Sequence, residues 1–218
     1  MIVNYVFKHL LFNPIILFSR LFYTIYFPLV HIFNLSLVNH NTLAHSHILS
    51  LIYSIILSIL SPIGIYILLF NYYIQNVFII NLSKFIFNLS ISYFTVDLFL
   101  GITYYPEILK TKIFTFGIHH ITYISMLIYG NINNLLPIYI IAIPLEIPTV
   151  VLSIGYINKK YQNYKLFGIL FFIFRIVYNI LLIYKTYNYH NDICLFFITI
   201  LCVHLYWFNS YAQKYILK

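Results

Sequence analysis

The sequence predicts an all-α polytopic membrane protein with about seven transmembrane helices, and three observations carry this prediction. The 218 residues are 62% hydrophobic and only 7% charged, whereas a soluble domain carries about 25% charged residues. The mean hydropathy is +0.92. Apolar runs reach the ~20 residues that a spanning helix needs. These features exclude a soluble globular domain, and the high hydrophobicity excludes an intrinsically disordered chain.

Polar residues divide the chain into seven apolar stretches of spanning length. The expected spans cover residues 10–33, 47–70, 77–103, 113–130, 134–156, 165–188 and 192–212. The polar connections between them are short, so consecutive spans are expected to cross the membrane in alternating directions. A membrane β-barrel would instead show short segments of alternating polarity, which this sequence lacks.

Two of these stretches contain residues that disturb a helix. The first, at 10–33, includes Arg20 and two prolines, so an interfacial or kinked helix is an alternative to a true span. The fifth, at 134–156, contains Pro137, Pro144 and Pro148. Within a membrane a proline frees carbonyl groups that neighbouring groups or water must satisfy. A binding cavity and a merely kinked packing helix would both give this pattern.

The distribution of lysines predicts the orientation. With seven spans, one side of the membrane receives seven lysines: Lys110, Lys112, Lys159, Lys160, Lys165, Lys214 and Lys218. The other side receives Lys8 and Lys185. Because cytoplasmic loops carry an excess of Lys and Arg, the C-terminus is expected in the cytosol. The same rule accounts for the net charge of +8, so a nucleic-acid partner is not expected.

Several ionisable side chains lie inside the expected spans. An Asp, Lys or Arg there costs at least ~2.5 kcal/mol at the helix centre, so each such group needs a partner or a function. The ionisable side chains are Asp97, His119, His120, Glu146, Arg175 and His204. At a rise of ~1.5 Å per residue, Asp97 and the paired histidines lie at matching depth, roughly 10 Å inside the cytosolic boundary. Glu146 and Arg175 match each other near the midplane, and His204 falls between the two layers. The pattern predicts a polar cavity that opens toward the cytosol.

Other interpretations of these residues stay open. Glu146 and Arg175 could form a buried ion pair that fixes helix packing, and Asp97 could pair with a histidine in the same way. The adjacent His119 and His120 point about 100° apart on a helix. Such a pair suits proton transfer, because an unperturbed imidazole titrates near neutrality.

Several other kinds of site are not expected from the sequence. The two adjacent histidines lack the His-x-x-x-His spacing of a metal site, so no metal is expected. The chain also has no G-x-S-x-G motif for nucleophilic hydrolysis and no glycine-rich nucleotide-binding pattern. We therefore expect no cofactor.

Six short motifs in chain order resemble those of one family. They are T-L-A-H-S at 42–46, S-Y-F-T-V-D at 92–97, H-H at 119–120, L-E-I-P-T at 145–149, F-F-I-F-R at 171–175 and Y-W-F at 206–208. Together they resemble the TLC domain, which translocation-associated membrane proteins, ceramide synthases and several small lipid-linked membrane proteins share. Within that family the chain looks closest to the small members resembling transmembrane protein 56.

The resemblance implies a domain organisation and a location. Residues 41–214 would form a TLC domain with six core helices around a lipid-accessible cavity. Residues 1–40 would supply an N-terminal membrane helix and its connection, and residues 215–218 a short tail. The family also implies the endoplasmic reticulum or a related internal membrane.

The resemblance also implies roles for individual residues. His119 and His120 take the place of the paired histidines implicated in ceramide synthase catalysis. The other candidates would line the lipid cavity or form a structural polar core: His45, Asp97, Glu146, Arg175, His204 and Trp207. The ceramide synthase signature has two further aspartates, and Tyr139 and Ala142 occupy their positions in this chain.

Three functional hypotheses follow. The first is a protein that binds or senses a sphingolipid or fatty-acyl lipid and influences membrane lipid composition, with membrane lipids as its partners. The second is an N-acyltransferase with acyl-CoA as substrate, in which His120 acts as general base or transient acyl acceptor. Asp97 or Glu146 would then orient the imidazole. The third is a membrane chaperone or cargo-handling protein. Because the two aspartates are missing, the sequence leaves open whether the protein is an enzyme.

Overall fold

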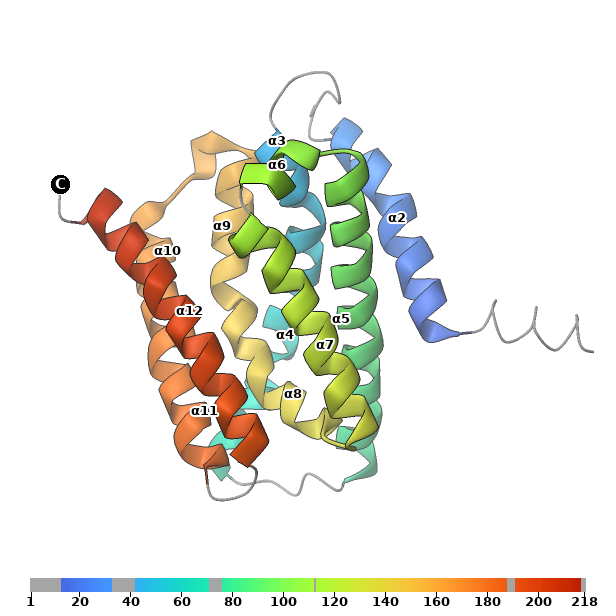
Figure 1. The fold of residues 1–218 in the computed structure, drawn as a ribbon, viewed down its shortest axis with the longest axis vertical. Coiled ribbons are helices and arrows are strands. Elements are labelled where there is room, and N and C mark those ends of the chain that lie inside the picture. Colours follow the sequence, from blue (N-terminus) through green and yellow to red (C-terminus); the bar gives the residue numbers. More distant parts are fainter. Residues whose placement is uncertain (1–12, 33–41, 71–75, 112, 188–190, 217–218) are drawn as a thin grey trace, which may run out of the picture. The chain divides into compact units, whose positions relative to one another are not determined.

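The structure, a computed structural model, describes residues 13–32, 42–70, 76–111, 113–187 and 191–216. Every regular element in these ranges is a helix, which confirms the all-α prediction (Figure 1). The chain forms two compact units. Unit 1 comprises Met1–Tyr53 and Gln75–Tyr139, and unit 2 comprises Ser54–Ile74 and Ile140–Lys218. Parts of the predictions lie outside the described residues: positions 10–12, 33, 188, Lys8, Lys112 and Lys218.

Six of the described helical segments are long and apolar enough to cross a membrane. They are Pro14–Ile32, Ala44–Phe70, Val77–Thr103, Leu136–Ile157, Tyr164–Thr186 and Ile193–Tyr215. Each corresponds to one expected span. The remaining expected span, at 113–130, is also helical, but it begins as the π-helical segment η1 (Ile113–Ile118) and continues as α7 (His119–Ile132).

Unit 1 is built around one long helix. Its elements are α2 (Pro14–Ile32), α3 (Thr42–Ser46), the first turns of α4 (Ile48–Phe70), α5 (Val77–Thr103), α6 (Pro106–Thr111), η1, α7 and the start of α8 (Leu136–Ala142). Both α2 and α7 pack against α5, with α2 running in the direction of α5 and α7 in the opposite one (Figure 1). The Asn76 side chain caps α5 by accepting the Phe78 N–H at 2.8 Å.

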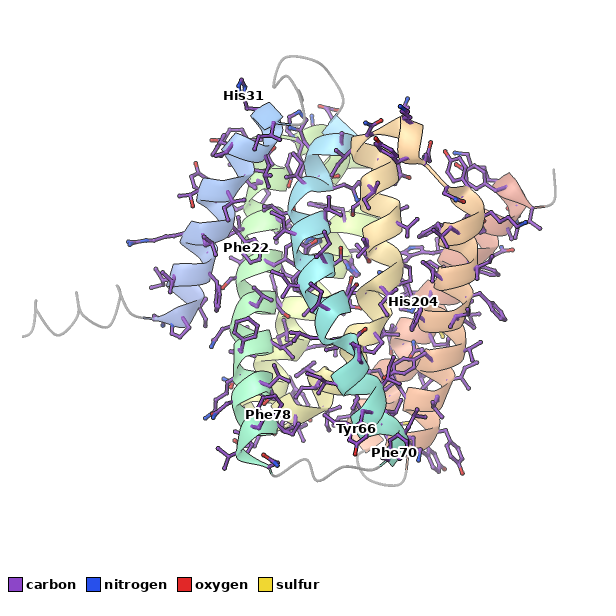
Figure 2. All side chains as sticks on the ribbon, turned by 180° about the vertical axis from the view of Figure 1, so that it is seen from behind. Phe22, His31, Tyr66, Phe70, Phe78 and His204 are labelled. Carbon is purple, nitrogen blue, oxygen red and sulfur yellow. The ribbon has the colours of Figure 1, made fainter. Side chains whose placement is uncertain are left out.

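The apolar face of α2 explains how this helix tolerates a charge. Phe22 and Tyr26 are buried, and Phe22 lies on the face of α2 that points to α5 (Figure 2). The Phe22 ring lies 6.0 Å from the ring of Tyr93. Arg20 is on the exposed side of the helix. Arg20 therefore does not interrupt the packing of α2.

Two cross-helix hydrogen bonds fix the start of α4 against α5. The hydroxyl groups of Ser50 and Tyr93 lie 2.8 Å apart, and the Tyr53 hydroxyl donates to Ser90 at 2.9 Å. The rings of Tyr53 and Tyr93 stack at 4.1 Å. Since hydroxyl groups in a membrane helix need internal partners, this arrangement satisfies four of them while packing two aromatic rings.

Unit 2 contains the rest of α4 and α8 and the C-terminal helices. These are η2 (Ile143–Glu146), α9 (Ile147–Ile157), η3 (Lys159–Tyr161), α10 (Tyr164–Leu170), η4 (Phe171–Val177), α11 (Tyr178–Thr186) and α12 (Asn191–Tyr215). Segments α10, η4 and α11 form one continuous helical rod, and α12 packs along it in the opposite direction (Figure 1).

Prolines reshape the helix that carries Glu146. Pro144 has no N–H to donate to the Ile140 carbonyl, and the chain tightens into the short 3₁₀ segment η2, where the Ile147 N–H donates to the Pro144 carbonyl. The Ile140 carbonyl instead abuts Gly64 of α4, where any Cβ atom would collide with it. The close approach of α4 at Gly64 therefore accommodates the break that positions Glu146.

Candidate functional site

The predicted site residues fall into two buried polar groups. Unit 1 holds His45, Asp97, His119 and His120, and unit 2 holds Glu146, Arg175, His204 and Trp207. Within each unit the structure brings most of these side chains into contact. Some of these side chains contact residues other than those that lie at the same calculated depth in the membrane.

An aspartate and a histidine form the centre of the group in unit 1. His120 Nε2 of α7 lies 3.0 Å from Asp97 Oδ2 of α5. The other ring nitrogen, Nδ1, lies 2.7 Å from the carbonyl oxygen of Phe116 in η1. Asp97 is 1% exposed and His120 is 4% exposed. Both side chains are therefore removed from solvent.

These contacts define where protons lie. A carbonyl oxygen only accepts, so His120 Nδ1 carries a proton and donates it to Phe116. The contact between Nε2 and Asp97 then holds one further proton, either as imidazolium and carboxylate or as neutral imidazole and carboxylic acid. The pair is electrically neutral in both forms, which lowers the cost of burying it.

Tyr105 completes the partners of Asp97. The hydroxyl group of Tyr105, just after α5, donates to Asp97 Oδ1 at 2.7 Å. Burial of the phenol, together with the nearby Asp97 carboxylate, raises the pKa of Tyr105 well above its ordinary value. The phenol therefore stays protonated and donates. Both carboxyl oxygens of Asp97 are thereby hydrogen-bonded.

A glycine and a π-helical segment position His120. The Phe116 ring lies so close to α5 that a Cβ atom at Gly101 would be 2.5 Å from its Cε1 atom. The same ring is centred 4.4 Å from the imidazole of His120. Gly101 thus lets η1 approach α5, and η1 supplies the carbonyl that orients His120. Single π-helical turns within α-helices occur often at functional sites.

His119 and His45 have different surroundings from His120. The His119 ring is partly buried, 4.5 Å from the ring of Tyr123 and 5.6 Å from that of His120. His45 is buried, and its Nδ1 atom lies 3.2 Å from the hydroxyl group of Tyr26 in α2. The paired histidines therefore occupy unequal environments, and His45 packs with the N-terminal helix.

The group in unit 2 is organised by Arg175. Its Nε atom donates to the Leu145 carbonyl at 3.0 Å, and Nη2 donates to Thr149 Oγ1 at 2.7 Å. The same hydroxyl donates to Glu146 Oε2 at 2.8 Å, whereas Arg175 Nη2 lies 3.6 Å from that oxygen. Thr149 therefore links the two charged groups more closely than they contact each other.

Aromatic rings and a histidine surround the same arginine. Its guanidinium carbon lies 5.5 Å from the centre of the Phe171 ring and 5.8 Å from that of Trp207, which are cation–π distances. His204 of α12 points toward η4 and places Nδ1 3.0 Å from the Arg175 carbonyl oxygen. The position of His204 within unit 2 is visible in Figure 2. All four predicted residues of unit 2 thus belong to one network.

Sequence reasoning missed Asn179, four residues after Arg175 on the same helical rod. The residue is 0% exposed, and neither its Oδ1 nor its Nδ2 atom has a hydrogen-bond partner among the described residues. A buried carboxamide without a partner costs about 1–3 kcal/mol. The only signal in the sequence is its position at i+4 from a buried arginine.

At one of the two positions where the ceramide synthase signature has an aspartate, Tyr139 makes structural contacts. The Tyr139 hydroxyl donates to the Met126 carbonyl within unit 1. Its ring lies against Gly130, where a Cβ atom would collide with it. Tyr139 therefore anchors the end of α7 to α8.

Among the described residues, no group of three or more His, Cys, Asp or Glu side chains could hold a metal ion.

A family model described as TLC domain matches residues 43–213. Neither a curated protein nor a solved structure matches the chain. The matched region contains all eight predicted site residues.

Proposed function

The chain belongs to the TLC-domain family, and from that premise we propose that it binds a sphingolipid or fatty-acyl lipid and thereby influences membrane lipid composition. It is a multi-pass integral membrane protein of a lipid-related family. The bias of its lysines supports a cytosolic C-terminus, and the family supports the endoplasmic reticulum or a related internal membrane. Membrane lipids are its proposed partners, and binding them requires no cofactor.

The unpartnered amide of Asn179 carries the lipid-binding proposal. A carboxamide in hydrocarbon presents a donor and an acceptor side by side, and both need partners. The carboxyl group of a fatty acid and the amide and hydroxyl groups of a sphingolipid carry both kinds of partner. Because Asn179 is 0% exposed, the proposal requires the polar group of such a lipid to enter between the helices of unit 2 while its acyl chains stay in the bilayer.

The geometry of His120 supports binding over acyl transfer. A general base needs a nitrogen within reach of the proton that it removes. Both nitrogens of His120 are occupied by Asp97 and by the Phe116 carbonyl, and the side chain is buried. His120 is therefore proposed to position α7 against α5.

Photo-crosslinking tests the proposed function. Membranes containing the wild-type protein are irradiated with a bifunctional fatty acid or sphingosine, with and without an excess of the unlabelled lipid. We expect labelling that the unlabelled lipid suppresses, in peptides from residues 171–186, and its loss in Asn179→Leu. The matched control is Asn209→Leu, because Asn209 is exposed on α12 of the same unit. Absence of suppressible labelling in the wild type would overturn the lipid-binding proposal.

One observation favours acyl transfer as a second candidate function. His119 is less buried than His120 and lies beside the Asp97–His120 pair. In this alternative His119 accepts the proton of the attacking amine, whose nitrogen forms an amide bond with the acyl carbon of acyl-CoA. The thioester bond breaks, and coenzyme A takes up the proton from His119 and leaves as its thiol. An assay with labelled acyl-CoA and a sphingoid base would show product from wild type and none from His119→Ala at equal expression. Equal turnover by both proteins would exclude His119 as the base.

A further inference from the structure

We propose that one end of unit 2 is a binding site for the headgroups of anionic phospholipids. The site, here the basic–aromatic end, consists of four exposed lysines and two stacked tyrosines: Lys159, Lys160, Lys165, Lys214, Tyr164 and Tyr215. They come from η3, the start of α10 and the end of α12. The proposal is independent of the lipid contact at Asn179, which lies fifteen residues, or roughly 20 Å, further along the rod from Tyr164.

Aromatic contacts hold the two helix ends together. The rings of Tyr164 and Tyr215 stack with their centres 3.9 Å apart. The Tyr211 hydroxyl donates to the Tyr164 carbonyl at 2.7 Å. Lys214 Nζ lies 5.1 Å from the centre of the Tyr215 ring, and Lys165 directly follows Tyr164. The stacked rings therefore place lysines from two helices at one location.

Side-chain caps fix the segment that carries the other two lysines. The Asn158 side chain accepts the Lys160 N–H at 3.0 Å, and the Asn163 side chain accepts the Leu166 N–H at 2.9 Å. Gly155 of α9 lets the backbone of this segment approach closely, since a Cβ atom there would be 3.2 Å from Gln162 Cα. The loop between α9 and α10 is thus capped by side chains at both ends, and its lysines are exposed.

Among the described residues, no carboxylate forms an ion pair with the lysines at this end. Between residues 147 and 218 the sequence has one acidic residue, Asp192, and it lies in the first turn of α12 whereas Lys214 lies in the last. In unit 1, by contrast, Lys110 Nζ is 3.1 Å from Glu107 Oε1. The lysines of the basic–aromatic end are therefore available to negatively charged groups from outside the chain.

The membrane surface supplies a partner of that chemistry. Tyrosines gather at the level of the headgroups, where their rings are in the apolar layer and their hydroxyl groups are hydrated. Lysine clusters that adjoin a membrane helix attract anionic lipids, with about a fivefold gain in binding for each lysine. The phosphate and carboxylate groups of phosphatidylserine provide the missing negative charges. The partner we infer is therefore an anionic phospholipid within the bilayer.

The single tryptophan provides the test. Trp207 precedes Lys214 by seven residues, or about 10 Å along α12. The protein is placed in phosphatidylcholine nanodiscs, and energy transfer from Trp207 to phosphatidylserine with a dansyl group on its acyl chain is measured. The same titration uses dansyl-labelled phosphatidylcholine. We expect at least about tenfold tighter association of phosphatidylserine. Equal association of the two lipids would overturn the proposal.

Two variants with the same net charge separate a local site from a general charge effect. In the first, the four lysines of the basic–aromatic end become glutamine: K159Q, K160Q, K165Q and K214Q. In the control, four basic residues elsewhere become glutamine: R20Q, K84Q, K110Q and K185Q. We expect the first variant to lose the preference for phosphatidylserine and the control to keep it. An equal loss in both variants would contradict a local site.

Two measurements on the wild-type protein keep the test decisive if the first variant fails to fold. Raising the salt concentration from about 0.1 M to about 1 M shortens the Debye length from roughly 10 Å to roughly 3 Å. This screening should abolish the preference for phosphatidylserine over phosphatidylcholine. A preference that persists at high salt would contradict an electrostatic site. Displacement of phosphatidylserine by soluble glycerophosphoserine or inorganic phosphate at similar concentrations would mean that the site binds free anions, and it would also overturn the proposal.

Discussion

His120 Nε2 lies 3.0 Å from Asp97 Oδ2, and the second ring nitrogen of His120 is hydrogen-bonded to the Phe116 carbonyl. The imidazole is therefore held at both ends, by α5 and by η1. Such a side chain fixes the position of its own helix. This relationship underlies the proposal that the polar group of unit 1 supports the fold, whereas the proposed lipid contact is at Asn179 in unit 2.

Substitutions of Asp97 test which proton arrangement the pair needs. An amide in Asp97→Asn can donate to a neutral Nε2 of His120 and still accept from Tyr105, so a loss of at most about 1.5 kcal/mol in the free energy of unfolding is expected. Asp97→Ala leaves both partners unpaired and should cost about 3 kcal/mol. Unfolding by sodium dodecyl sulfate in mixed micelles, followed by circular dichroism, measures both. Equal losses would show that the imidazolium–carboxylate form is required.

Gly101 is expected to be intolerant of a side chain because of Phe116. The Cβ atom of Gly101→Ala would lie 2.5 Å from Phe116 Cε1, so the ring and the carbonyl that orients His120 must move. A loss of about 1–3 kcal/mol in stability is expected in the same unfolding assay. The smaller side chain of Phe116→Leu should recover part of that loss in the double variant. Additive losses in the double variant would contradict a direct contact between these two positions.

Thr149 is expected to matter for its hydroxyl group rather than for its shape. The hydroxyl accepts from Arg175 and donates to Glu146, so Thr149→Val leaves two buried charged groups with a lost hydrogen bond each. A destabilisation of about 2 kcal/mol is expected, since hydrogen bonds to charged groups contribute about 1.5–3 kcal/mol. Thr149→Ser keeps the hydroxyl and should lose much less. If Ser and Val variants unfold at the same detergent concentration, the methyl group is the important part of Thr149.

The sequence was sufficient to predict the helical spans and the approximate depth of the polar residues. Span boundaries follow from hydropathy, and helix rise is constant enough to place Asp97 level with His120 and Glu146 level with Arg175. The direct partners could not be predicted in the same way. Thr149 bridges Glu146 and Arg175, for which a direct ion pair was only one of two interpretations, and His45 contacts Tyr26 of α2. These partners depend on rotation of each helix about its axis, which hydropathy leaves undefined.

The two π-helical segments were also beyond sequence reasoning. Segment η1 precedes the paired histidines and η4 contains Arg175. The residue types in both are ordinary for apolar helices, so no local propensity indicates the wider turn. Tertiary contacts account for the first, because Phe116 must reach α5 at Gly101. Wide turns of this kind depend on packing between elements that are distant in sequence.

Asn179 is expected to lower the stability of the lipid-free protein and to be required for lipid binding. Its amide has no partner among the described residues, so Asn179→Leu, with a side chain of similar size, is expected to raise the free energy of unfolding of the lipid-free protein by about 1–2 kcal/mol. The same substitution should abolish suppressible lipid labelling, because the donor and acceptor for the lipid are removed. Stabilisation at the expense of function is typical of residues that serve a ligand. The unfolding assay and the crosslinking assay are run on the same preparations, with Asn209→Leu as the control. A variant that is less stable and still labelled would mean that the amide serves the fold instead of the lipid.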